Sequence, residues 1–127
     1  MIVGVGTDVI DIARVERMFA AHGDRMLQRM FMPEEIRYTE KRADRTAALA
    51  VRLAAKEAVY KALTGNDLAR SISWRDIEVC NNGDGAPSLT LHGRAQARAV
   101  ELGVTRIHVS LSHSAASAVA FVVAERE

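Results

Sequence analysis

The fold is decided by RTAALAVRLAAKEAVYKAL, residues Arg45 to Leu63, which predicts one long helix with almost no polar face. Alanine and leucine are strong helix formers, and the stretch contains no Gly or Pro. Asp44 precedes it as the expected N-cap, and Gly65 follows where a left-handed C-terminal cap is expected. Because such a helix must bury most of its surface, we expect it to be the main packing element of the core.

Two stripes of charge run along this helix on a wheel of about 100° per residue: Arg45, Arg52 and Lys56 form one, and Glu57 and Lys61 form the other. Alanine, leucine and tyrosine surround the second stripe, so we expect Glu57 to be half buried. A buried carboxylate costs several kcal/mol unless a cation or metal compensates it. The alternative is a simple surface ion pair between Glu57 and Lys61.

Composition limits the class of protein. The 127 residues fit a single domain over residues 1–127, and 49% apolar with 26% charged residues are typical of an ordered chain. A formal charge of +1 argues against a nucleic-acid-binding or membrane-binding protein. Cys80 is the only cysteine, which suits the reducing cytoplasm, and we interpret it as a small apolar filler. Without a signal-like start or a membrane-length apolar run, we expect a soluble protein.

The N-terminal residues predict a strand over residues 2–7 followed by a helix. Gly4 and Gly6 permit another backbone to approach this strand closely. Asp8 is predicted to lie at the strand's end, and Asp11 to be the N-cap of the helix. Unlike Asp11, Asp8 has no obvious structural role.

Later segments alternate between helical and strand patterns. We predict a helix from Pro33 to about Arg42, an irregular loop over 66–73, a hairpin of strands 74–80 and 87–91, a helix over 93–102, and strands over 106–112 and 118–124. Helices and antiparallel strands mix without a repeated strand-helix-strand pattern, which indicates an α+β fold.

Some polar residues are candidates for chemistry. His113 lies in SLSHS at the end of a strand, where hydroxyls and an imidazole could meet a phosphate; a polar turn is the alternative. Asp8 and Glu57 are carboxylates of the kind that Mg²⁺ takes alongside water and substrate phosphates. Arg14 and Arg17 lie away from the apolar stripe of the first helix, and Arg25 follows later in the chain; a solvated face is the simplest interpretation of these charges.

Several motifs together resemble one family. They are GTDVIDI at 6–12, FMPEEIRY at 31–38, AAKEAVYKAL at 54–63, GAP at 85–87 and SLSHS at 110–114. In this order and spacing the chain resembles holo-acyl-carrier-protein synthase, the short AcpS-type phosphopantetheinyl transferase, over nearly its whole length. It departs from the family at Leu53, where Phe is frequent, and at Ser117, where Tyr is common.

The resemblance implies a 4'-phosphopantetheinyl transferase-like fold, with the long helix packed on a small, mainly antiparallel sheet. It also implies transfer of the 4'-phosphopantetheine arm of coenzyme A to a serine of apo acyl carrier protein, with release of 3',5'-ADP. Asp8 and Glu57 would hold Mg²⁺, and Lys61 would add a cation near the diphosphate. The expected contacts to the nucleotide phosphates are Arg52, His113 and Ser114. Further candidates, which could act from a neighbouring subunit, are Lys41, Arg42 and Arg45.

The same resemblance implies a homotrimer with active sites between subunits, and docking of the acidic carrier on Arg14, Arg17 and Arg25. The serine proton would go to Glu57 or to a metal-bound water ordered by a carboxylate such as Glu35. Two other functions remain open from the residues: a Mg²⁺-dependent phosphohydrolase using the same groups, and a non-catalytic adaptor that binds acidic partners through Arg14 and Arg17.

Overall fold

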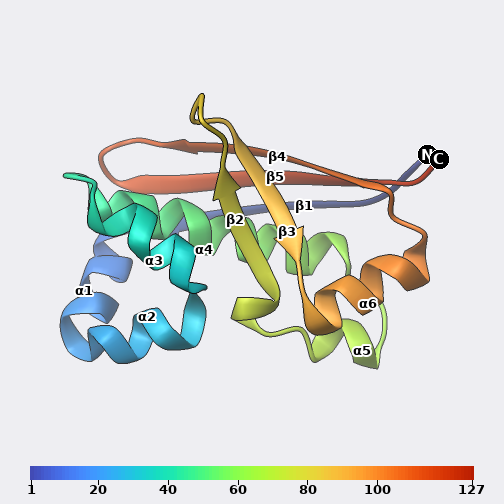
Figure 1. Ribbon diagram of the computed structural model, residues 1–127, viewed down its shortest axis with the longest axis horizontal. Coiled ribbons are helices and arrows are strands. Elements are labelled where there is room, and N and C mark those ends of the chain that lie inside the picture. The colour runs from blue at the N-terminus through green and yellow to red at the C-terminus, as the bar shows by residue number, and fades with distance from the viewer.

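The long helix α4 (Arg45–Ala62) lies at the centre of the fold, in a computed structural model that describes all of residues 1–127 (Figure 1). Twelve of its residues are buried, in line with its expected packing role. The helix ends one residue earlier than predicted, with Leu63 as its C-cap. Gly65 has φ +135° but lies beyond the cap, so it does not close the helix in the expected way.

One face of α4 packs against a three-stranded antiparallel sheet. Its order is β1 (Ile2–Asp11), β5 (Ser117–Glu125) and β4 (Arg106–His113). The contact is close at Gly4 and Gly6, where an added Cβ would fall within 1.9 and 1.8 Å of α4 carbonyl oxygens. This confirms the predicted close approach of two backbones, and it explains why neither position can carry a side chain.

Strand β1 is four residues longer than predicted. Residues 8 to 11 continue the pairing with β5, so that Asp8 lies opposite Ala120 and Asp11 opposite Ser117. Asp8 is therefore inside a strand rather than at its end. Asp11 does hold the N-cap position of α1 (Ile12–His22), but its side chain makes no capping bond. The Ile12 amide donates to the carbonyl of Ala116.

A hairpin of β2 (Ile77–Asn81) and β3 (Pro87–Leu91) packs against another face of α4 and crosses it in Figure 1. The predicted hairpin and its turn are confirmed, but the first strand begins at Ile77. Residues Trp74–Asp76 form the 3-10 turn η1 instead, where the Asp76 carboxylate accepts a bond from the Ser73 amide (3.0 Å). The alternation from Trp74 onward did not reveal this capped turn.

Short helices cover the two ends of α4 (Figure 1). Helices α1, α2 (Asp24–Met30) and α3 (Pro33–Glu40) gather near its start, and α5 (Asp67–Arg70) and α6 (Gly93–Leu102) near its end. Helix α2 was not predicted. Helix α5 replaces part of the expected irregular loop, because Asn66 caps it by accepting the Ala69 amide (2.8 Å). None of the helices is long and apolar enough to span a membrane. The α+β class is confirmed.

Candidate active site

The period of β1 brings Asp8 to α4. Gly4, Gly6 and Asp8 alternate onto the same face of the strand, and the two glycines let α4 come close enough for Asp8 to reach it. The Lys61 ammonium donates to Asp8 Oδ1 (3.0 Å) and to the Thr7 carbonyl (2.9 Å). The Asp8 side chain is 16% exposed and that of Lys61 51%. Lys61 therefore pairs with Asp8, and the simple Glu57–Lys61 ion pair that the sequence left open is not formed.

Glu57 lies one helical turn before Lys61 and has no ion-pair partner. Partial burial raises the pKa of its carboxyl, and the nearby charge of Asp8 raises it further, against the opposing effects of Lys61 and Arg14. As expected, it is half buried. A carboxylate whose charge is disfavoured by a second one nearby forms with it a suitable donor pair for a divalent cation.

Two carboxylates suit Mg²⁺, which usually takes few protein ligands, better than they suit a cation that the protein must surround by itself. No group of three or more His, Cys, Asp or Glu side chains gathers anywhere in the structure. Asp8 and Glu57 would thus supply two ligands and leave the other positions to water and substrate oxygens, as is usual for Mg²⁺. The residues present fit the ion that the family resemblance implies.

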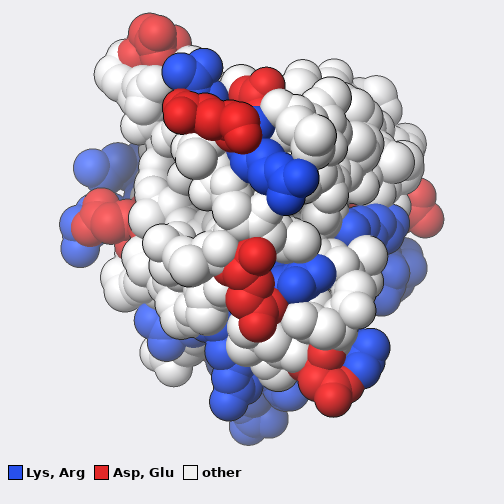
Figure 2. Space-filling model, turned by 90° about the vertical axis from the view of Figure 1, so that its right-hand side faces the viewer, with Lys and Arg blue, Asp and Glu red and all other residues white.

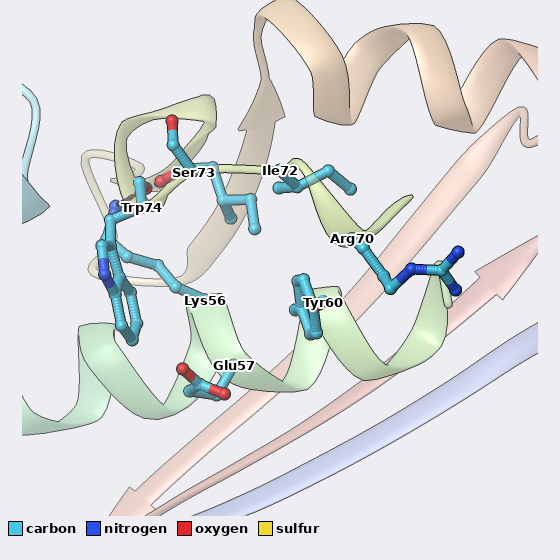
Figure 3. Close-up of a pocket in the computed structure, with 8 residues that line it drawn as sticks. Lys56, Glu57, Tyr60, Arg70, Ile72, Ser73 and Trp74 are labelled. Atoms are coloured by element: carbon cyan, nitrogen blue, oxygen red, sulfur yellow. Dashed lines mark hydrogen bonds between the residues drawn. The ribbon is translucent and has the colours of Figure 1, made fainter. Parts of the chain in front are cut away.

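Two hollows meet at Glu57. The first, of about 240 Å³, extends along α4 towards Arg70, and Figure 3 shows Glu57, Tyr60 and Trp74 around it. The second, of about 360 Å³, lies between β1, α1 and α4 and contains Asp8 and Arg14. Both are lined by Glu57 and Trp74. A substrate in either hollow could therefore reach the carboxylate pair.

Glu35 does not fit its expected role. Its side chain has no exposed surface, and its two oxygens accept bonds from the Lys56 ammonium (2.8 Å), the Met32 amide (2.9 Å) and the Val79 amide (3.2 Å). A carboxylate so fully bonded and buried cannot order a metal-bound water. Glu57 remains the better candidate for accepting a proton.

A second polar pocket, of about 200 Å³, gathers other predicted residues. Arg42, Arg52 and His113 line it together with Tyr38 and Asn81. The buried Arg52 guanidinium lies 4.5 Å from the Tyr38 ring centroid and bonds Asn81 Oδ1 and the Ala48 carbonyl. Tyr38 and Asn81 were not predicted. No sequence signal identified them, because their roles depend on where α3 and the hairpin pack.

The polar pocket is not lined by the remaining predicted nucleotide contacts, which are Lys41, Arg45 and Ser114. Arg45 stacks over Phe19 at 5.2 Å, and its Nε and Nη2 have no hydrogen-bond partner. Lys41 is exposed. Ser114 neighbours His113, but its Oγ accepts bonds from the amides of Ala116 and Ser117 in the β4–β5 turn. Arg45 therefore does not join Arg52 in one pocket, although both belong to the same helical stripe.

Helices α1 and α2 carry arginines without ion-pair partners. Arg14 lines the hollow at Glu57, and Arg25 lines an adjoining one of about 350 Å³ with Met18, Met30 and Trp74. Arg17 is exposed and lines neither. At the end of the molecule that carries α5 and α6, acidic and basic side chains are intermixed (Figure 2). Arg98 pairs there with Glu101, and Arg70, which lines the first hollow, pairs with Asp67. Uncompensated basic groups thus lie beside the carboxylate pair.

Known proteins resemble the chain along its whole length. The family model of the 4'-phosphopantetheinyl transferase superfamily matches residues 4–122. A holo-[acyl-carrier-protein] synthase of Alkalilimnicola ehrlichii is 47% identical over 98% of both chains. The crystal structure of the synthase from Neisseria meningitidis has a TM-score of 0.87 at 30% identity, covering 99% of this chain and 100% of that one. The Bacillus anthracis synthase, solved in complex with CoA (3',5'-ADP), has a TM-score of 0.78 at 35% identity, covering 100% and 99%.

The chain belongs to the holo-[acyl-carrier-protein] synthase family. It is an enzyme of the phosphopantetheinyl transferase class. Of the two departures from the family motifs, Leu53 is buried in the cluster that includes Phe31, and Ser117 opens β5 opposite Asp11. Leu53 also lines the hollow that contains Asp8 and Glu57.

Proposed function

We propose that this synthase transfers the 4'-phosphopantetheine arm of coenzyme A to a serine hydroxyl of apo acyl carrier protein, with Mg²⁺ as the required cation and 3',5'-ADP as the second product. The proposal rests on two neighbouring carboxylates. Glu57 is half buried and has no ion-pair partner, and Asp8 is bonded to Lys61. The relatives' names supply the two substrates.

In this reaction the serine oxygen bonds to the β-phosphorus, and the bond from that phosphorus to the bridging oxygen of the α-phosphate breaks. The α-phosphate leaves as part of 3',5'-ADP. When bound, Mg²⁺ would supply positive charge against the diphosphate. Asp8 and Glu57 would hold that ion, and the half-exposed Lys61 ammonium would add a second cation beside the leaving oxygen. Glu57, whose pKa is raised by burial and by Asp8, is the proposed acceptor of the serine proton.

The nucleotide pocket of Arg42, Arg52 and His113 is proposed to come from a neighbouring subunit. Arg52 and Glu57 are five residues apart in α4, about 140° around the helix, so they face different directions. One coenzyme molecule could more readily contact Glu57 of one subunit and Arg52 of a neighbouring subunit. The exposed outer face of the sheet carries Val5, Val9, Val119 and Phe121 and would suit assembly into a homotrimer.

The carrier protein is proposed to dock on α1 and α2. Arg14 borders the hollow that contains Glu57, and Arg17 and Arg25 lie on the same two helices without ion-pair partners. Acidic carriers would be attracted by these charges, which would deliver the serine to the carboxylate pair. A cytoplasmic location fits the substrates and the single free Cys80.

Mass spectrometry of an apo carrier protein incubated with coenzyme A, Mg²⁺ and this protein tests the proposal. The carrier should gain the mass of the arm, and EDTA should prevent the gain. Consumption of coenzyme A with an unmodified carrier would indicate a phosphohydrolase instead. If neither molecule changes while the carrier still binds, the protein is an adaptor.

A further inference from the structure

Lys56 is a buried cation that the proposed chemistry does not use. Its side chain has no exposed surface, and its ammonium donates to Glu35 Oε1 (2.8 Å), the Trp74 carbonyl (3.1 Å) and the Ile77 carbonyl. All three of its protons are thereby satisfied. The bonds join α3, α4 and the segment 74–77, which are distant in the sequence.

The segment that Lys56 holds carries Trp74, whose side chain lies between the two hollows at Glu57. Figure 3 shows the indole descending from η1 towards α4, next to Glu57 and facing Tyr60 across the first hollow. Trp74 also lines the second hollow, with Asp8 and Arg14. Apart from Lys56, this turn is held by the Ser73–Asp76 cap and by the bond from the His92 amide to the Asp76 carbonyl (2.7 Å).

We propose that Lys56, anchored by Glu35, is a positioning residue that holds Trp74 as the wall between the two substrate hollows. The inference rests on the proposed function and adds that the carrier serine enters through the hollow bordered by Arg14, while the coenzyme arm enters through the other hollow. Lys56 also lines the first hollow, but its ammonium is fully occupied by Glu35 and the two carbonyls. Its effect on the reaction passes through the backbone carbonyls of Trp74 and Ile77.

Energetics favour a positioning role over a purely stabilising one. Burying an ion pair costs desolvation energy that apolar side chains of similar size would avoid. A lysine that only filled the core could therefore be replaced by methionine. Here the ammonium reaches two carbonyl oxygens of one short segment, and that segment carries the aromatic ring beside Glu57. Methionine would fill the space but leave both carbonyls without this donor.

The test compares the double variant E35Q/K56M with R98M. The double variant removes both charges and keeps one side-chain oxygen, which can still accept from either the Met32 or the Val79 amide. Arg98 is a matched control, because it is also buried and bonds two backbone carbonyls, those of Leu63 and Thr64, but it lines neither hollow. Trp74 is the only tryptophan, so its fluorescence reports directly on the wall.

In E35Q/K56M we expect Trp74 emission to shift to longer wavelength and to be quenched more strongly by acrylamide. The kcat for arm transfer should fall on the order of tenfold, because the reacting groups are less well aligned. KM should rise for coenzyme A and for the carrier together, since the wall faces both. R98M should show unchanged Trp74 fluorescence and kcat despite lower stability.

Unaltered fluorescence in a folded E35Q/K56M would overturn the proposal, as would altered fluorescence with unaltered kcat and KM. A change in only one KM would also overturn it, because Trp74 would then border one substrate alone. The fluorescence is read without substrates. A wild-type protein that transfers no arm would therefore refute the proposed function, while the clamp on Trp74 would still be tested.

Discussion

Lys56 and Glu57 are neighbours in α4, yet the structure surrounds their charges in opposite ways. Lys56 is fully buried and fully bonded, to a carboxylate and two carbonyls. Glu57 is half buried between two hollows and has no ion-pair partner. A buried charge whose bonds are all made within the protein, as at Lys56, holds segments of the fold together. A carboxylate without a counter-charge beside a second carboxylate, as at Glu57, can bind a cation.

The largest expected effect comes from removing the proposed ligands. Asp8→Ala or Glu57→Ala should lower the rate of arm transfer roughly 1,000-fold, because charge stabilisation by the cation contributes several kcal/mol. Carrier mass spectrometry gives the rate, and circular dichroism should show an intact fold. Glu16→Ala, an exposed carboxylate on α1, is the control and should retain activity. A fully active Asp8→Ala/Glu57→Ala protein would remove the basis of the mechanism.

Substitution of Lys56 is expected to lower stability, whereas loss of Asp8 or Glu57 is expected to leave the fold intact. Lys56→Met alone should lower the free energy of unfolding by about 3–5 kcal/mol, because it leaves Glu35 charged and buried without its cation. Urea denaturation measures the change. Adding Glu35→Gln should recover much of the loss. If the single and double variants are equally stable, the buried pair is not an electrostatic unit.

Arg14 tests the carrier side of the site. Arg14→Glu should raise KM for the carrier about tenfold and leave KM for coenzyme A nearly unchanged, because it reverses a charge at the proposed docking surface. The assay is best run at pH 8, since Arg14 helps to lower the pKa of Glu57. Arg94→Glu, on α6 at the other end of the molecule, is the charge-matched control. Equal changes in both KM values would contradict docking on α1.

The smallest expected effect is on the melting temperature, when the charge of Glu57 is removed. Because the folded-state pKa of Glu57 is raised, the folded protein binds its proton more tightly than the unfolded chain, and this group destabilises the fold as pH rises through that pKa. Glu57→Gln in metal-free protein should therefore melt about 1–3 °C higher at neutral pH. Calorimetry should find the gain shrinking as the pH is lowered. A lower melting temperature at neutral pH would mean that Glu57 is compensated after all.

Local patterns predicted most elements but not their ends. The α4 helix, the hairpin and the strand with Gly4 and Gly6 followed from propensity and period. Helix α2, the capped turn at Trp74 and the extension of β1 past Asp8 did not. The turn and the extension are completed by bonds to residues far along the chain, such as Lys56 for Trp74 and β5 for Asp8. Asp11 and Asp44 hold the expected N-cap positions, but neither side chain makes a capping bond; the Asp44 carboxylate pairs with Arg42.

The sequence by itself determined the α4 helix, its two charge stripes and the motifs that identified the family, since these depend on residues a few positions apart. Only the tertiary structure decided that Lys61 pairs with Asp8 and that Lys56 is buried in an ion pair with Glu35. It also decided that Arg45 stacks on Phe19 and does not share a pocket with Arg52. The physical reason is that the energy of a charge depends on its nearest polar neighbours and its exposure. Distant segments supply both once they pack around the helix.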